Sequence, residues 1–118
     1  MRDDHALLHD ILERIQLTYT FTKEGRETFM SSRLIQEAVL RNLEIIGEAA
    51  RIVSEDLRNE HPEIPWRQIG AFRNFVIHVY WSVKLERIWQ IVDVDLPVLE
   101  NQIVQLLPAI DTDSRDET

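Results

Sequence analysis

A short polar cluster between residues 73 and 80 holds the side chains best suited to chemistry in this chain. The segment reads Arg-Asn-Phe-Val-Ile-His-Val-Tyr and is otherwise apolar. Arg73 can hold a phosphate, His78 can exchange a proton near neutral pH, and Tyr80 can donate or accept a hydrogen bond. Burying such groups in an apolar helix is costly unless each is paired or faces a cleft. The cluster is therefore the leading candidate for a functional site.

The spacing of these residues limits how they can act together. On one straight helix, Arg73 and Tyr80 lie within about 20° of each other, and Asn74 and His78 share an adjacent face. Because the two pairs point more than about 100° apart, a single helix does not bring all four to one small ligand. Convergence requires that the helix ends before Tyr80, or that a second copy of the segment lies across a two-fold axis.

A paired site of this kind suits cleavage of a phosphodiester by its own ribose 2′-hydroxyl. One His takes a proton and a second group returns one, while Arg steadies the charge on the phosphorane. This reaction needs no metal ion and no cofactor, and the chain offers no convincing carboxylate cluster for a metal. The alternative is structural, because a His and a Tyr late in a helix often bind a backbone carbonyl and fix a turn. The spacing alone leaves both interpretations open.

The elements that position this cluster are predicted to be helices. Gly and Pro are scarce, at three and four residues, and no short alternating segments lie between turn dipeptides, so the fold class is all-α. We expect an up-and-down bundle of four to five helices that dimerises. A first helix is predicted over residues 4–20, capped by Asp3 or Asp4, and a long second helix over 31–59 after a turn or short helix at 26–30.

Prolines divide the second half of the chain. Pro62 ends the long helix, and Pro65 fits the first turn of a third helix from residue 66 to 77 or 80. A fourth helix is predicted to begin at Lys84, to be kinked or restarted by Pro97, and to end where Pro108 closes the fold. Residues 1–110 then form one domain, and the acidic residues 111–118 a disordered tail.

The composition narrows the possible partners. The net charge is −8, from 13 basic and 21 acidic residues. Nonspecific affinity for nucleic acid comes mainly from phosphate neutralisation, so a broad nucleic-acid-binding surface is disfavoured. A small basic cleft or a basic protein partner remains compatible with this charge. The chain has no cysteine, no apolar core of a signal peptide and no run long enough to span a membrane, which fits a cytoplasmic protein.

Other polar patterns have structural explanations. His5 and His9 stand four apart on the first helix, but no third ligand is evident and we expect no metal site there. Five charged residues on the long helix step at intervals of three and four, which predicts an exposed ladder of ion pairs rather than acid–base catalysis. They are Arg41, Glu44, Glu48, Arg51 and Glu55.

Two glycines and three tryptophans have predicted packing roles. Gly47 and Gly70 lie inside predicted helices, where each costs about 1 kcal/mol relative to Ala, so we expect close helix approach at both. Trp66, Trp81 and Trp89 are expected to anchor the core or an interface, and Trp81 could also line a groove beside Tyr80.

Four blocks of the sequence together carry a family resemblance. They are residues 41–51 (RNLEIIGEAAR), 65–74 (PWRQIGAFRN), 78–81 (HVYW) and 95–97 (DLP). Over most of residues 5–107 the chain resembles the HepT-like branch of the HEPN superfamily. The resemblance implies an all-α, dimeric toxin of a toxin–antitoxin pair that cleaves RNA without a metal. It also implies a cognate antitoxin, a minimal nucleotidyltransferase of the MNT type.

The resemblance also implies roles for four residues. Arg73 and His78 match the catalytic pair of the family, and Asn74 matches the polar residue after the Arg. Tyr80 matches the tyrosine that the antitoxin modifies with AMP, which would place negative charge where an RNA phosphate must bind. Val79 departs from relatives, which often carry Gly there.

Two non-catalytic alternatives remain at this point. In the first, the domain is a helical binding module that is the partner and modification substrate of a nucleotidyltransferase, which the acidic charge favours. In the second, it is a plain dimerisation module whose polar cluster fixes the interface.

Overall fold

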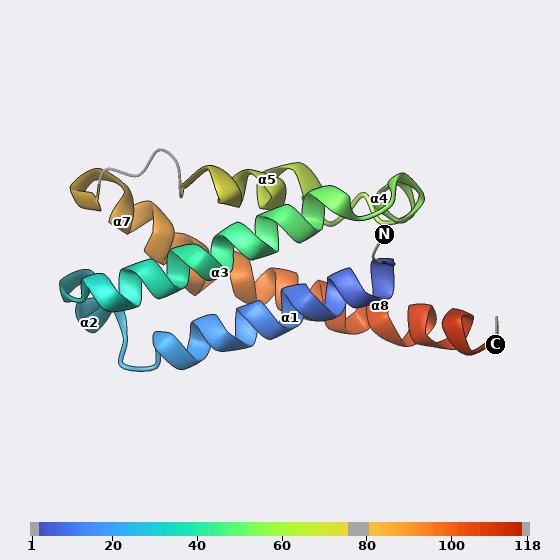
Figure 1. Cartoon of the computed structure of the whole chain (residues 1–118), viewed down its shortest axis with the longest axis horizontal. Helices are drawn as coiled ribbons and strands as arrows, with labels where there is room; N and C mark the ends of the chain where they lie inside the picture. Colours follow the sequence, from blue (N-terminus) through green and yellow to red (C-terminus); the bar gives the residue numbers. More distant parts are fainter. Residues whose placement is uncertain (1–2, 76–80, 117–118) are drawn as a thin grey trace.

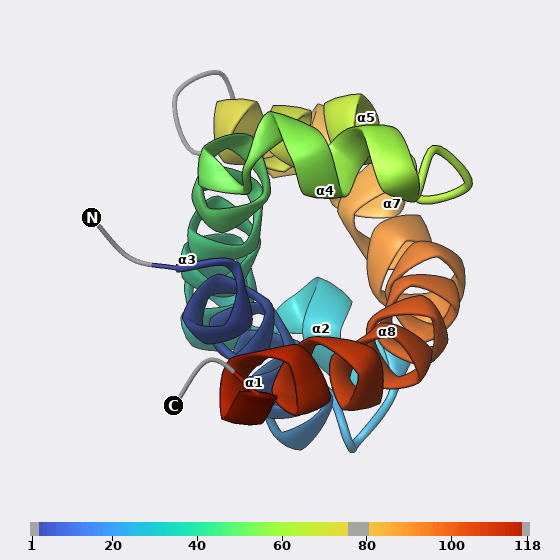
Figure 2. The same ribbon diagram turned by 90° about the vertical axis from the view of Figure 1, so that its right-hand side faces the viewer.

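The computed structural model of this chain describes residues 3–75 and 81–116, and within these ranges every regular element is a helix (Figure 1). Helices α1 (Asp4–Phe21) and α3 (Arg33–Ile52) pack against each other along the bundle, and α8 (Leu96–Asp116) packs against α1. Viewed from the end, α4 (Glu55–Glu60) and α5 (Trp66–Gly70) cover the side opposite α1 (Figure 2). The predicted all-α bundle is confirmed, whereas dimerisation stays a prediction.

Helix α1 begins and ends close to the predicted bounds. The carboxylate of Asp3 accepts a hydrogen bond from the Ala6 backbone N–H at 2.8 Å, which satisfies one of the unpaired donors of the first turn. The helix buries an apolar stripe that includes Leu8, Ile11 and Ile15. Beyond it, Gly25 adopts a φ of 96°, a left-handed conformation that favours glycine. The chain then turns into the short helix α2 (Arg26–Ser31).

The long helix α3 is shorter than the sequence predicts. Ser32 caps its start by accepting from the Ile35 N–H at 3.2 Å, as expected, but the helix ends at Ile52 rather than near residue 59. The hydroxyl of Ser54 accepts from the Leu57 N–H at 3.1 Å and so starts the separate helix α4. Asp4 stabilises this break, because its carboxylate accepts from the Ser54 N–H at 2.9 Å and from the hydroxyl at 2.6 Å.

The predicted third helix is α5 followed by a 3₁₀ turn, η1 (Ala71–Arg73). Its predicted end, at residue 77 or 80, lies outside the described residues. The next described helix, α7 (Trp81–Gln90), begins three residues earlier than expected.

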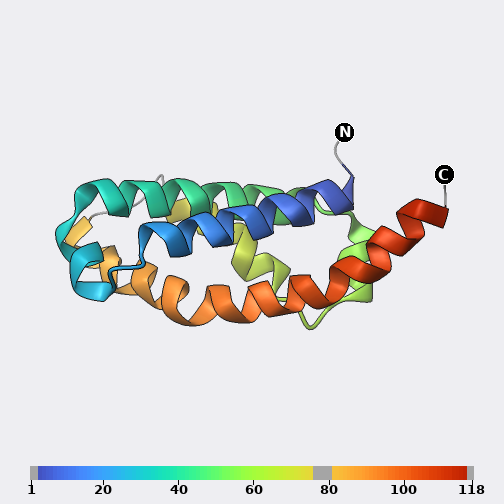
Figure 3. The same ribbon diagram turned by 90° about the horizontal axis from the view of Figure 1, so that it is seen from below.

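The run from α7 through η2 (Ile91–Asp95) to α8 lies along one side of the bundle (Figure 3). Two prolines in this run have different effects. Helix α7 runs into a π turn, η2 (Ile91–Asp95), and α8 restarts at Leu96, whose N–H bonds to the Ile91 carbonyl. Pro97 has no N–H for an α-helical bond, so the predicted restart is confirmed. Pro108, by contrast, lies inside α8 and does not close the fold. Pro108 has no N–H to donate to the carbonyl of Val104, and Val104 is half-exposed. The division at residue 110 and the disordered tail stay predictions.

One aliphatic core joins these helices. Its largest fully buried side chains are Leu8, Ile11, Ile15, Phe29, Val39, Leu43, Ile46, Ile64, Ile88, Ile91, Leu96 and Ile103. Trp89 packs on Phe29 with ring centroids 5.4 Å apart, and Trp66 is only 8% exposed, so both serve as the predicted anchors. The side chain of Trp81 lies outside the described residues. None of the described helices is both long and apolar enough to cross a membrane.

Tyr19 is one of four described residues with a buried side-chain polar atom that has no hydrogen-bond partner within the described ranges. The hydroxyl of Tyr19 on α1 is buried and has no hydrogen bond among the described residues. Burial, with a smaller contribution from the charge of Glu100, raises the pKa of Tyr19 to about 12. In the folded protein the phenol therefore stays neutral at pH values well above its ordinary pKa of 10.0.

Candidate functional site

Arg73 is held in place through its backbone, by contact with Gly47 on α3. A Cβ atom at Gly47 would lie 2.8 Å from the Arg73 nitrogen and 3.1 Å from the carbonyl oxygens of Ile69 and Gly70. Real Cβ atoms do not approach backbone so closely, so no other residue fits without displacing η1. The close approach predicted at Gly47 is confirmed, and its consequence is that the position of Arg73 is fixed by the core.

The side chain of Arg73 has a carboxylate partner from the same stretch of α3. Arg73 Nη1 donates to Glu48 Oε2 at 3.3 Å, and both side chains are partly exposed, at 39% and 51%. Sequence analysis placed Glu48 in an exposed ladder along the helix. Arg41 and Glu44 do form such a pair, but Glu48 instead reaches across to the candidate site.

Gly70 makes room for a second arginine. A Cβ atom there would lie 2.9 Å from Cγ of Arg51, which shows that the stem of Arg51 runs directly over Gly70. The second close approach is therefore also confirmed. Arg51 is exposed and makes no ion pair within the described ranges, so the ladder prediction is wrong for it as well.

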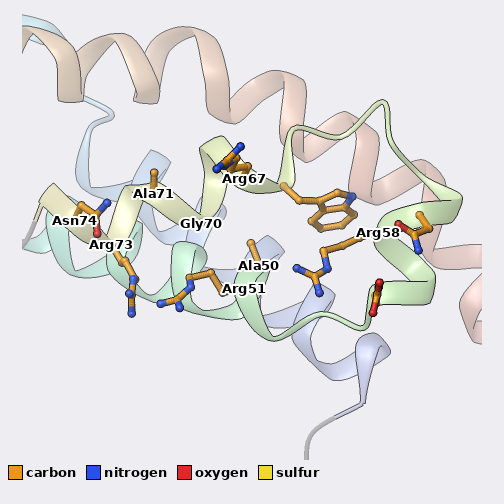
Figure 4. Close-up of a pocket in the computed structure, with 11 residues that line it drawn as sticks. Ala50, Arg51, Arg58, Arg67, Gly70, Ala71, Arg73 and Asn74 are labelled. Atoms are coloured by element: carbon orange, nitrogen blue, oxygen red, sulfur yellow. The ribbon is translucent and has the colours of Figure 1, made fainter.

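A cleft of about 720 Å³ opens beside these residues, lined by the end of α3, by α4, by α5 and by η1. Its lining residues are Ala50, Arg51, Glu55, Arg58, Asn59, Trp66, Arg67, Gly70, Ala71, Arg73 and Asn74. We call it the arginine cleft, after Arg51, Arg58, Arg67 and Arg73. Figure 4 shows Arg73, Arg51 and Arg58 following one another along one edge, with Arg67 across from them in this view.

Trp66 and Arg58 both line the arginine cleft. The buried Trp66 ring donates its Nε1–H to the His61 carbonyl at 3.0 Å, which fixes the loop before α5. Nε of Arg58 is buried and has no hydrogen-bond partner among the described residues. A buried guanidinium N–H without a partner is costly, so Arg58 carries an unbalanced charge beside the cleft that it lines.

Sequence reasoning found Arg73 and Asn74 but missed most of this cleft. Both predicted residues lie on its rim, close together at the end of η1. Arg58 and Arg67 were not singled out, and Arg51 was assigned to the surface ladder. One feature of the sequence could have indicated the cleft. Arginines recur within and between residues 41–51 and 65–74 of a chain that is acidic as a whole.

His78 and Tyr80, the other two predicted site residues, lie outside the described residues. Their convergence with Arg73 and Asn74 therefore stays a prediction, and so do the catalytic roles. His5 and His9 lie edge to face with ring centroids 4.5 Å apart. In the described ranges, no group of three or more His, Cys, Asp or Glu side chains is arranged to hold a metal ion.

Comparison with known proteins identifies the family. Residues 10–106 match the family model described as "Ribonuclease HepT-like". The chain is 41% identical over 106 residues to "Probable ribonuclease HepT" of Thermococcus cleftensis, covering 89% of this chain and 96% of that protein. It is 38% identical over 103 residues to "Putative RNase MJ1380" of Methanocaldococcus jannaschii, covering 86% and 94%. No solved structure gives a significant match. The chain belongs to the HepT-like ribonuclease family.

Proposed function

We propose that this protein is an endoribonuclease that cuts RNA without a metal ion, in a groove between two copies of the chain. The observation that carries the proposal is the position of Arg73. Its backbone is fixed against Gly47, and its side chain lies on the rim of a cleft with three more arginines. In this ribonuclease family member, His78 follows Arg73 by five residues. A phosphate-binding group and a proton-transfer group thus lie close together in the chain.

The proposed reaction divides the work among four residues. His78 removes the proton of the ribose 2′-hydroxyl, whose oxygen then forms a bond to the adjacent phosphorus. The bond from phosphorus to the 5′-oxygen breaks, and a second group, such as His78 of the other copy, protonates that oxygen. Arg73 holds the phosphate and balances the growing negative charge, while Asn74 and Tyr80 position it. The products are a 2′,3′-cyclic phosphate and a 5′-hydroxyl.

Glu48 supports the role of Arg73 in this scheme. It engages one guanidinium nitrogen at 3.3 Å and leaves the remaining N–H groups of the five for a phosphate. A guanidinium already held by one carboxylate loses less conformational freedom when substrate binds.

We further propose that the protein is the toxin of a type II toxin–antitoxin pair in the cytoplasm. Its antitoxin would be an MNT-type minimal nucleotidyltransferase that transfers AMP to Tyr80. Tyr80 lies seven residues after Arg73. A phosphate on its hydroxyl would compete with RNA for the arginines of the cleft and repel the RNA backbone.

The test is cleavage of a labelled RNA pool by purified protein with excess chelator. Wild type is compared with His78→Ala and with Arg73→Lys, which keeps the charge but removes the guanidinium fork. We expect wild type to leave 2′,3′-cyclic phosphate ends and both variants to lose activity. Equal products from wild type and His78→Ala would refute the catalytic proposal.

A second candidate is favoured by the net charge of −8, which disfavours RNA binding outside a local cleft. In it, the domain does not cleave RNA and serves as partner and modification substrate of the nucleotidyltransferase. Absence of cleavage, with Tyr80-dependent transfer of AMP by the partner enzyme, would support this candidate.

A further inference from the structure

The arginine cleft concentrates positive charge in an acidic protein. Four of the eleven arginines of the chain line it, together with a single carboxylate, Glu55. The chain as a whole has a net charge of −8. Because like charges in one cleft repel each other, the arrangement favours a bound anion that balances them.

Three of these arginines have no charge partner in the part of the chain that the structure describes. Several other arginines are paired with carboxylates, as Arg26 is with Glu86 and Arg87 with Asp95. No carboxylate of the described ranges pairs with Arg51, Arg58 or Arg67. Nε of Arg58 is in addition buried and has no hydrogen-bond partner among the described residues. The charges of the three arginines are therefore not balanced by a carboxylate of that part of the chain.

The shape of the cleft selects an extended anion. Arg73 and Asn74 lie at one end and Arg58 at the other, so the charges are distributed along the cleft (Figure 4). A volume of about 720 Å³ is in the upper part of the range for small-ligand sites, roughly 300–1,000 Å³. One phosphate would leave most of these arginines without a ligand. A nucleic acid strand, with a phosphate at every nucleotide, meets them in series.

We infer that Arg51, Arg58 and Arg67 bind the backbone phosphates of single-stranded RNA beside the phosphate that Arg73 holds. The inference rests on the proposed function, and it adds the strand path and the substrate class. A single strand is favoured because a net charge of −8 disfavours the broad basic surface that the two strands of a duplex would contact. The three arginines contribute to substrate affinity. Cleavage takes place at the phosphate that Arg73 holds.

The experiment measures binding separately from cleavage. The probe is a fluorescent RNA dodecamer with every 2′-hydroxyl methylated, so that it cannot be cut. Its affinity is measured over a series of salt concentrations for wild type and for the triple variant Arg51→Gln, Arg58→Gln, Arg67→Gln. The matched control replaces Arg26, Arg33 and Arg87 by Gln, since these residues pair with Glu86, Glu37 and Asp95 away from the cleft.

For single strands, each phosphate contact contributes about 0.7 to the slope of log affinity against log salt, so the triple variant should lose about 2 in slope. The same relation gives a loss of about fivefold per arginine at roughly 0.1 M salt, or about a hundredfold for all three. The control triple variant should keep the wild-type slope. An unchanged slope in the cleft variant, or an equal loss in the control, would overturn the inference.

Cleavage then separates this inference from the proposed function. On an unmodified dodecamer the triple variant should show a raised KM, and its loss in kcat/KM should exceed the loss on a dinucleotide. If wild type cuts RNA and the triple variant cuts the dodecamer equally well, the inference fails and the proposed function stands. If wild type binds the methylated RNA through the cleft but cuts nothing, the proposed function fails instead. Tighter binding of duplex than of single-stranded RNA would overturn the substrate class.

Discussion

Replacing Gly47 by Ala should separate activity from stability. The new Cβ would lie 2.8 Å from the Arg73 nitrogen, with two carbonyl oxygens at 3.1 Å. An ordinary contact needs about 3.5 Å or more, so η1 must move away from α3 by roughly 0.7 Å. None of these three atoms can relax by a side-chain rotation, because all belong to the backbone.

Two opposing terms set the change in stability. Ala is favoured over Gly inside a helix by about 1 kcal/mol, and overpacking a well-packed contact costs about 1–3 kcal/mol. The free energy of unfolding should therefore fall by only about 0–2 kcal/mol. A displacement near 1 Å of a phosphate-binding group, in contrast, can reduce the rate by about a hundredfold. We expect a protein that is still folded but has lost most of its RNA cleavage.

The assay pairs urea unfolding with kcat/KM on the RNA cleaved by wild type. Gly70→Ala is the control, because its Cβ meets Cγ of Arg51, part of a flexible side chain that can rotate away. It should match or exceed the wild-type stability and cost far less activity. If Gly47→Ala were more stable by about the full helix-propensity gain of 1 kcal/mol and equally active, the contact would not position Arg73.

Two further predictions concern the bundle itself. Ser54→Ala removes the cap of α4 and the contacts to Asp4, and should lower the free energy of unfolding by about 1 kcal/mol, measured in urea beside the exposed Ser31→Ala. Tyr19→Phe should not destabilise the fold, since the lost hydroxyl has no hydrogen-bond partner among the described residues. Because folding raises the pKa of Tyr19 from 10.0 to about 12, wild type should lose stability from pH 10 to 12 and Tyr19→Phe should lose less. Parallel pH curves would contradict the burial of the phenol.

Local sequence patterns were sufficient to predict the structural features that depend on a single helix or turn. An acidic cap at Asp3, an apolar stripe and a glycine turn define α1. The energetic penalty of Gly47 and Gly70 in a helix already indicates close packing. Pro97 cannot donate a backbone hydrogen bond, and the helix restarts beside it.

The break between α3 and α4 was not predictable in this way. The apolar spacing continues through Val53 and Leu57, both of which are buried. The periodicity therefore predicts one continuous helix. Ser54 caps α4 locally, and Asp4, fifty residues earlier, fixes it in place. Such a contact depends on tertiary structure and leaves no local signal.

The arginine cleft depends on the same break. Arg51 and Arg58 lie on different helices, and Arg67 and Arg73 come from α5 and η1. The four arginines converge because the chain turns after Ile52. The sequence predicted one continuous helix over residues 31–59, without this turn. Only the rim residues Arg73 and Asn74 could be found, since they are adjacent in the chain.

The two shortest α-helices of the cleft wall bear on how this protein responds to a ligand. Helices α4 and α5 have six and five residues, far below the roughly 12–15 at which an isolated helix begins to persist in water. Their order comes from packing, through Leu57, Trp66 and Ile69. Local unfolding of this wall should therefore need less free energy than opening α1 or α3, and its amides should exchange with solvent sooner. A ligand that holds Arg58 and Arg67 must slow that exchange, so hydrogen-exchange protection of α4 and α5 becomes a direct measure of occupancy.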